Sequence, residues 1–194
     1  MSTEFLRKEF SKMNALRENR KRVATLVLSD KNLVKDLVSL TFLVEDEISI
    51  KAAWILEWIC THDSINNVLP YLDDFITGLP KLKFDSAIRP CAKICEHLAN
   101  AYADEIVNKT QKTLSQEHID NIIEIGFDWL ITPQKIAVRA YTMNSLFLFG
   151  LEKDWVHPEL KHLIETKIIH QSKGTKARGK QILKLIEKHQ KSRS

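Results

Sequence analysis

The chain has 194 residues, of which 44% are hydrophobic and 28% are charged, a balance that argues against a largely disordered chain. Only five glycines and five prolines are present, so the composition favours long helices with short connections over an all-β fold. The net charge of +4 is uneven: residues 1–22 carry +4 and residues 173–194 carry +7, which leaves −7 on residues 23–172. The basic tail either attracts phosphate groups or remains a solvated, frayed terminus.

Apolar residues recur at helical spacing along most of the chain and predict helices in chain order. Two N-terminal helices are expected over residues 3–17 and 19–28, and the Ser29-Asp30 turn signal ends the second one. Four helix pairs then follow, over residues 33–44 and 48–61, 65–77 and 86–103, 117–131 and 134–151, and 158–171 and 175–188. The polar segment over residues 103–114 is expected to form a helix end and a loop.

A short pattern recurs near the start of the second helix of each pair: a small or aliphatic residue, a basic residue and a compact residue. The four copies are Ile50-Lys51-Ala52, Ile88-Arg89-Pro90, Val138-Arg139-Ala140 and Ala177-Arg178-Gly179. Their basic residues are separated by 38, 50 and 39 positions. This period indicates a helical repeat array, because one helix pair cannot bury its own apolar stripe and must stack on its neighbours.

The repeats resemble those of the HEAT family over about residues 30–190. The resemblance rests on the basic residue near the start of each second helix and on the small residues that follow it. Pro90 and the interval of 50 residues depart from the pattern. The resemblance implies an all-α superhelix, a right-handed α-α solenoid of about four helix pairs whose second helices line the concave surface. We expect a single domain over residues 1–194, with N-terminal helices in residues 1–29 and a frayed basic tail in residues 189–194.

The first candidate binding site is the row of basic residues in this pattern: Lys51, Arg89, Arg139 and Arg178. If the second helices stack side by side, the cations are spaced by roughly one helix diameter, about 10 Å. Such a row could follow a phosphodiester backbone. In the alternative interpretation the cations pair with carbonyls or acidic residues of neighbouring repeats, and the acidic residues at hand are Asp46, Glu47, Asp85 and Asp128. For Arg139 we expect a buried stem bonded to a carboxylate or a carbonyl.

Trp54 and Trp58 form the second candidate site, because they lie three and seven positions after Lys51 and so share its helix face. With Glu57 beside them, they could stack a base or another ligand. Alkylpurine DNA glycosylases built from HEAT-like repeats are similar in composition, with tryptophans, an acid and basic residues on the concave surface. That resemblance assigns no catalytic residue in this chain. In the alternative interpretation both tryptophans are core residues.

Other chemistry has little support in the sequence. Cys60, Cys91 and Cys95 lie in apolar helical segments without a C-x-x-C pair, and we expect buried, reduced thiols. The seven histidines show no spacing suited to a shared metal, and phosphate-loop and nucleophile motifs are missing. We therefore expect no catalytic residue, metal or cofactor. No apolar stretch is long enough to cross a bilayer, and no signal peptide is evident, so we expect no membrane insertion and a cytoplasmic location.

The sequence predicts a non-catalytic HEAT-like scaffold that binds a protein partner, whose identity it does not reveal. The alternative is a nucleic-acid binder, or a protein similar to an alkylbase DNA-repair glycosylase, that uses a basic concave face. The charge of −7 on residues 23–172 disfavours a broad phosphate track. The two hypotheses are distinguished by whether the four basic residues are exposed or neutralised.

Overall fold

The computed structural model describes the backbone of residues 2–193, and over this range all regular secondary structure is helical, with no strand. Two helices open the chain, α1 (Ser2–Ser11) and α2 (Arg17–Leu28). The remaining α-helices are α3 (Lys31–Thr41), α4 (Ile48–His62), α5 (Leu72–Gly78), α6 (Asp85–Tyr102), α7 (Lys109–Thr113), α8 (Gln116–Ile131), α9 (Ile136–Phe149), α10 (Val156–Thr166) and α11 (Lys173–Arg193). Four short 3-10 turns cover Ile65–Asn67, Leu69–Tyr71, Leu79–Lys81 and Ile168–His170. None of these helices combines the length and apolar character needed to cross a membrane.

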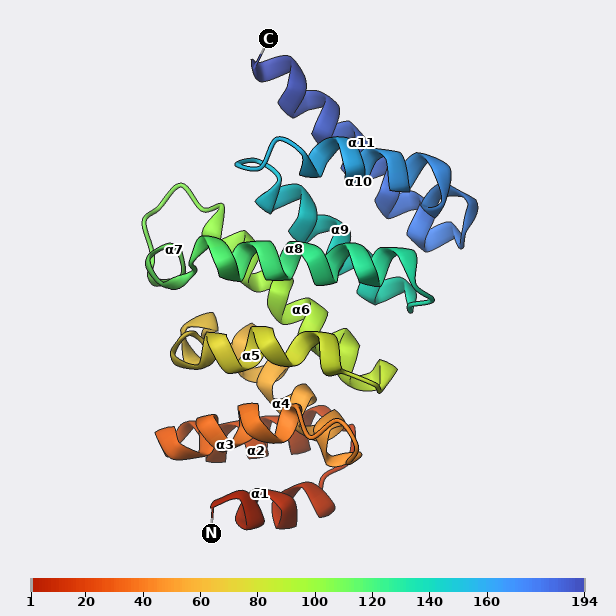
Figure 1. The fold of residues 1–194 in the computed structure, drawn as a ribbon. Coiled ribbons are helices and arrows are strands. Elements are labelled where there is room, and N and C mark those ends of the chain that lie inside the picture. Colours follow the sequence, from red (N-terminus) through yellow and green to blue (C-terminus); the bar gives the residue numbers. More distant parts are fainter. Residues whose placement is uncertain (1, 194) are drawn as a thin grey trace.

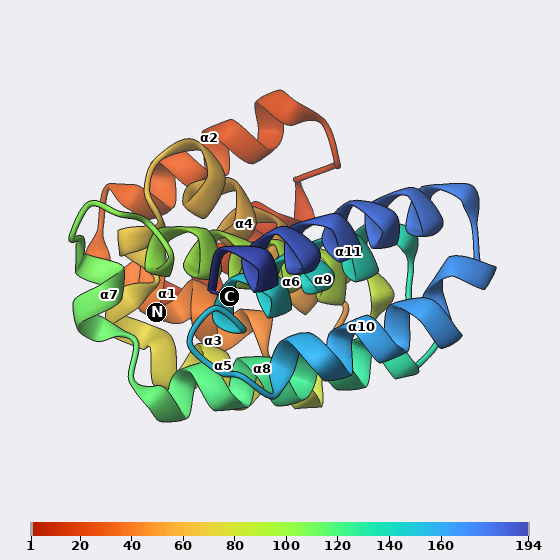
Figure 2. The same ribbon diagram turned by 90° about the horizontal axis from the view of Figure 1, so that it is seen from above.

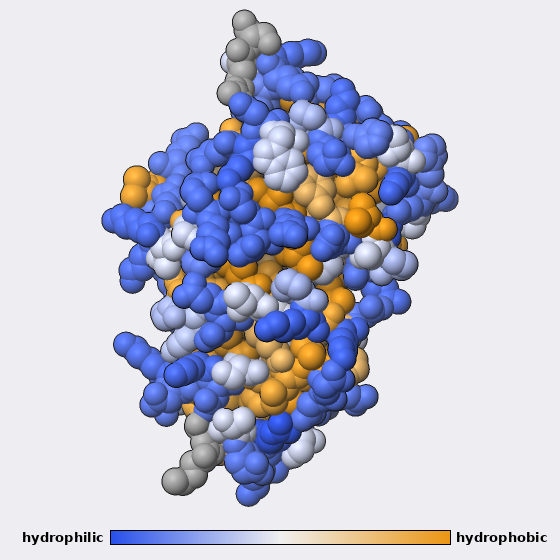
Figure 3. All heavy atoms as spheres, in the orientation of Figure 1, coloured by the Kyte–Doolittle hydropathy of each residue, from blue (hydrophilic) through white to orange (hydrophobic). Residues whose placement is uncertain are grey.

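The helices are arranged in two layers. Figure 1 looks onto the first layer, in which α3, α5, α8 and α10 lie one above another. The second layer consists of α4, α6, α9 and α11, where α4 contacts α6, α6 contacts α9 and α9 contacts α11. Figure 2, seen from above, places α2 on the far side of the second layer, where it packs against α4. The surface of the first layer shows hydrophobic strips between rows of hydrophilic residues (Figure 3).

Burial of apolar side chains between neighbouring helices explains this arrangement. On α4 the residues Ile55, Leu56 and Ile59 are fully buried, and Ile94 and Leu98 of α6 are fully buried as well. Each apolar side chain that leaves water contributes about 1.5–3 kcal/mol. Alanines accompany them where helices approach closely, and Ala52 and Ala53 have no exposed surface. The apolar faces that the sequence predicts are therefore the faces on which the layers meet.

The helix predicted over residues 65–77 is wrong in its first half. Two 3-10 turns replace it, and α5 begins only at Leu72. Pro70 explains the difference, because proline has no backbone N–H and disfavours a helical conformation in the residue before it. At the other end of α5, a Cβ atom on Gly78 would lie 2.3 Å from the ring of Phe42, so only glycine fits there.

Two further expectations on local structure need correction. Residues 103–114 were expected to form a helix end and a loop, but they contain the short helix α7. Asn108 caps this helix by accepting a hydrogen bond from the backbone N–H of Gln111. The basic tail expected to fray from residue 189 continues as helix α11 to Arg193. Ser194, the last residue of that expected tail, lies outside the described residues.

Candidate binding site

All four basic residues of the recurring pattern lie within the first two turns of second-layer helices. Lys51 is in α4, Arg89 in α6, Arg139 in α9 and Arg178 in α11. The connections that lead from the first layer into these helices lie at one side of the molecule, on the right in Figure 1. The pattern therefore marks one edge of the second layer, where four consecutive helices begin.

The two outer members of the row already have partners within the chain. Lys51 donates from Nζ to the carbonyl oxygen of Phe10 at 2.6 Å, which ties α4 to α1. Arg178 donates to Oε1 of Gln181 at 2.9 Å and lies 3.5 Å from a carboxylate oxygen of Glu96. Because Glu96 neutralises Arg178, the last cation of the row is not available to an anionic ligand.

The two central members, like Lys51, have no carboxylate partner among the described residues. Arg139 donates from Nη2 to the carbonyl oxygen of Thr132 at 2.9 Å, which confirms the predicted bond to a carbonyl. Its Nε is buried and has no hydrogen-bond partner among the described residues, and burial lowers its pKa. The side chain of Arg89 makes no hydrogen bond or ion pair with any residue in the described range. Asp120, on the helix before Arg139, pairs with Lys153.

Three adjoining hollows follow this edge, and together we call them the edge groove. Their volumes are about 460, 340 and 500 Å³ in order from α4 to α11. Trp54 lines the first and second hollows, whereas Asp85 and Lys135 line the second and third. The shared residues show that the hollows adjoin one another along the starts of α4, α6, α9 and α11.

The edge groove combines positive charge with apolar surface. The cations that line it are Arg7, Arg20, Lys51, Arg89, Lys135 and Arg139. Its two acids are Glu47 and Asp85, and Asp85 lies 3.5 Å from the ammonium of Lys135. Trp54 and Ile136 supply apolar surface, and Ile136 is half exposed. An elongated ligand that bears both carboxylates and apolar groups would satisfy this lining.

The structure separates the two tryptophans that the sequence grouped together. Trp54 faces the edge groove and donates from Nε1 to the carbonyl oxygen of Ser86 at 3.1 Å. Trp58 is buried under α2, where the ring of His62 stacks on it with centroids 3.9 Å apart. The guanidinium groups of Arg17 and Arg20 cover the same indole at 5.6 and 5.2 Å. Only Trp54 is therefore placed to contact a ligand in the groove.

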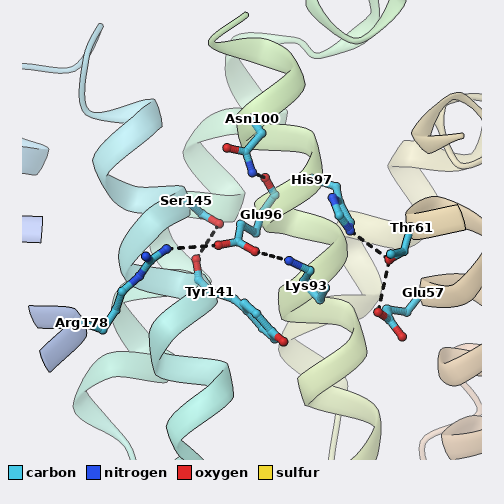
Figure 4. A network of polar contacts seen from close by, with 9 residues as sticks. All are labelled: Glu57, Thr61, Lys93, Glu96, His97, Asn100, Tyr141, Ser145 and Arg178. Atoms are coloured by element: carbon cyan, nitrogen blue, oxygen red, sulfur yellow. Dashed lines mark hydrogen bonds and ion pairs between the residues drawn. The ribbon is translucent and has the colours of Figure 1, made fainter. Parts of the chain in front are cut away.

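A polar network that the sequence did not reveal lies farther along the second layer (Figure 4). At its centre is Glu96, whose side chain is only 8% exposed. Its carboxylate accepts from the ammonium of Lys93 at 2.6 Å and lies 3.5 Å from the guanidinium of Arg178. The ammonium of Lys93 also lies 4.7 Å from the ring centre of Tyr141. Lys93 is three residues before Glu96, and this spacing was the only local signal of the network.

A second branch of the network joins α4 to α6. His97 lies with Nε2 3.0 Å from the hydroxyl of Thr61, which donates to the carboxylate of Glu57 at 3.2 Å. Burial lowers the pKa of His97, and the nearby charge of Lys93 lowers it further, whereas Glu96 and Glu57 oppose the shift. A neutral imidazole that donates to Thr61 fits this arrangement. Because the charged groups pair with one another, the network is suited to joining helices.

Among the described residues, no group of three or more His, Cys, Asp or Glu side chains is arranged to hold a metal ion. Cys60, Cys91 and Cys95 are free and buried, as predicted. Burial raises the pKa of the Cys95 thiol to about 12 and also raises the pKa values of Cys60 and Cys91. These thiols are therefore protonated, and they are not poised as nucleophiles.

Comparison with known proteins found no match: neither a protein-family model, nor a curated protein, nor a solved structure is significantly similar to this chain.

Proposed function

We propose that the chain is a HEAT-like helical-repeat scaffold, without enzymatic activity of its own, that binds an acidic segment of a partner protein in the edge groove. The repeat interpretation extends the observed two-layer helical arrangement to a solenoid of about four helix pairs. It is supported by the recurrence of one basic residue near the start of each second-layer helix. Three reduced, buried thiols are in keeping with a cytoplasmic location for such a scaffold.

The edge groove is the observation that carries the proposal. Six cations and two acids line it. Arg7 pairs with Asp46 and Lys135 with Asp85, and the other four cations have no ion-pair partner among the described residues, so the field of the groove attracts anionic groups. Arg89 and Arg139 bring cationic groups that no carboxylate of the described chain neutralises. Trp54 and Ile136 add apolar surface, on which apolar groups of a ligand can pack. Aspartate and glutamate side chains interspersed with apolar ones provide both kinds of contact.

Nucleic-acid binding remains the second candidate, favoured by the same row of cations. A phosphodiester track gains affinity from each phosphate that a cation neutralises. Here Asp85 interrupts the row at its centre, and Glu96 neutralises Arg178 at its end. Of the four cations in the row, only Lys51, Arg89 and Arg139 line the groove, which makes a short basic stretch. This length suits a few carboxylates of a peptide better than the continuous charge of a duplex.

Fluorescence anisotropy with two labelled probes tests the proposal. The first probe is a peptide of about twelve residues that alternates glutamate and leucine, and the second is a DNA duplex of about 20 base pairs, both at about 50 mM salt. The groove variant carries Arg89→Glu and Arg139→Glu. The matched control carries Lys180→Glu and Lys184→Glu, two exposed lysines of α11 with no ion pair in the described structure, so the net charge changes equally.

We expect the peptide to bind the wild type and the control alike and to bind the groove variant at least tenfold more weakly. Equal peptide binding by all three proteins, or no binding by the wild type, would refute the proposal. If only the duplex binds and only the groove variant loses it, the nucleic-acid alternative replaces the peptide proposal.

A further inference from the structure

A separate hollow lies on the first layer, between α8 and the start of α10. Its volume is about 580 Å³, and the residues that line it are Asp120, Glu124, Phe127, Asp128, Lys153 and Trp155. None of these residues lines the edge groove, which follows the starts of second-layer helices. The two surfaces therefore belong to different layers of the molecule, and the first layer faces the viewer in Figures 1 and 3.

An exposed aromatic pair forms the apolar part of this hollow. Trp155 is 54% exposed, although tryptophan side chains are usually well buried. The half-buried ring of Phe127 supports it, with ring centroids 5.6 Å apart and an angle of 30° between the planes. An indole held in place by a neighbouring ring and still open to water offers a rigid contact surface at little cost in side-chain entropy.

Carboxylates surround the aromatic pair. Asp120, Glu124 and Asp128 are spaced four residues apart on α8, so they form one row along the helix. The ammonium of Lys153 pairs with Asp120, which shows that the hollow already accommodates a cation of this chain. The carboxylates of Glu124 and Asp128 are exposed and have no hydrogen-bond or ion-pair partner within the described residues.

We propose that this hollow binds an arginine side chain carried by a basic segment of a partner protein. The flat guanidinium stacks on the indole of Trp155 while its N–H groups donate to the carboxylates of Glu124 and Asp128. Arginine meets both requirements because its cation is planar and carries several donors, whereas the ammonium of lysine is a compact point charge. The charge of this ligand is opposite to that of the ligand proposed for the edge groove, and neither proposal depends on the other.

Nuclear magnetic resonance of the tryptophan indole N–H groups tests this site directly. The chain has four tryptophans, so four indole signals are expected, and Trp155→Phe identifies the signal of Trp155. The probe is a peptide of about ten residues that alternates arginine and glycine, compared with its lysine counterpart. We expect the arginine peptide to shift the signal of Trp155 in a saturable way, to leave the signal of Trp54 in the edge groove unchanged, and to bind more tightly than the lysine peptide.

Two variants separate stacking from charge. Trp155→Ala should weaken binding of the arginine peptide about fivefold. Replacement of Glu124 by Gln together with Asp128 by Asn should weaken it about tenfold. The charge-matched control carries Asp74→Asn and Glu105→Gln, at exposed sites away from the hollow, and should bind as the wild type does. An unshifted Trp155 signal, equal affinity for the two peptides, or a control that loses as much affinity as the Glu124 and Asp128 variant would overturn the proposal.

Discussion

The guanidinium of Arg178 lies 3.5 Å from the carboxylate of Glu96, although 82 residues separate the two in the chain. Arg178 belongs to α11 and Glu96 to α6, and both helices pack against α9, which lies between them in the second layer. The ion pair therefore joins two helices that are not direct neighbours. Because Lys93 binds the other oxygen of Glu96, the carboxylate is satisfied on both sides.

Removal of this carboxylate should destabilise the fold. Glu96→Ala leaves Lys93 and Arg178 without their counter-charge in a largely buried setting, and we expect the free energy of unfolding to fall by about 2 kcal/mol. Urea denaturation followed by circular dichroism measures the change. Glu187→Ala, at an exposed site on α11, serves as the control and should stay within about 0.5 kcal/mol of the wild type. A loss for Glu96→Ala no larger than that of the control would contradict the expectation.

The stability of the protein should decrease as the pH falls below about 6.5, the ordinary pKa of histidine. Burial lowers the pKa of His97 in the folded state, so the unfolded chain binds a proton more readily than the folded one. The contribution of this group is complete above the ordinary pKa and is lost as the pH falls through the lower, folded value. His97→Gln should flatten the profile of melting temperature against pH between about pH 7 and pH 5. The same change at the exposed His170 should leave the slope as it is.

The three thiols should not react while the protein is folded. Cys60, Cys91 and Cys95 are buried, and burial raises the pKa of each. Ellman's reagent at about pH 8 should therefore titrate no thiol in native buffer and all three in guanidinium chloride. Fast reaction of even one thiol in native buffer would show that the helices which cover it open readily.

Gly78→Ala should destabilise the protein by about 1–3 kcal/mol, because the added Cβ would lie 2.3 Å from the ring of Phe42. That ring packs edge-on against Phe75, with centroids 5.8 Å apart, so it has little freedom to move. Phe42→Leu introduced together with Gly78→Ala should recover part of the loss. Gly174→Ala is the control, since its Cβ would lie 3.3 Å from the nearest side-chain atom at an exposed position. Thermal denaturation of the wild type and the three variants measures their melting temperatures. The lowest is expected for Gly78→Ala alone.

Arg139→Ala should have a smaller effect on stability than the loss of about 3 kcal/mol expected for a buried ion pair. Arg139 has one protein partner, the carbonyl oxygen of Thr132, and we expect a loss of about 1 kcal/mol. The same variant should weaken binding of the glutamate-leucine peptide in the edge groove. Lys180→Ala, at an exposed site, should change neither quantity. If Arg139→Ala unfolds the protein at room temperature, Arg139 is required for the fold. It would then no longer count among the cations that bind a ligand in the edge groove.

The repeated pattern identified the helix pairs and the edge along which the second-layer helices begin. Apolar spacing predicted the buried face of α4, because that signal is local to one helix. Local sequence could not reveal that α2 covers Trp58, or that Arg178 binds Glu96 and not an acid of its own pair. Both contacts depend on how distant helices stack. The same limit concealed the acidic hollow at Trp155, whose residues come from α8 and from the connection before α10.

The lining of the edge groove comes from helices that belong to four different pairs. The distance between Arg89 on α6 and Arg139 on α9 is therefore fixed by the spacing of two helices. A bound segment that contacts both holds that spacing constant and restrains bending of the whole stack. Occupied protein should thus be stiffer than free protein, with slower amide hydrogen exchange even in the parts of α6 and α9 that lie far from the bound ligand.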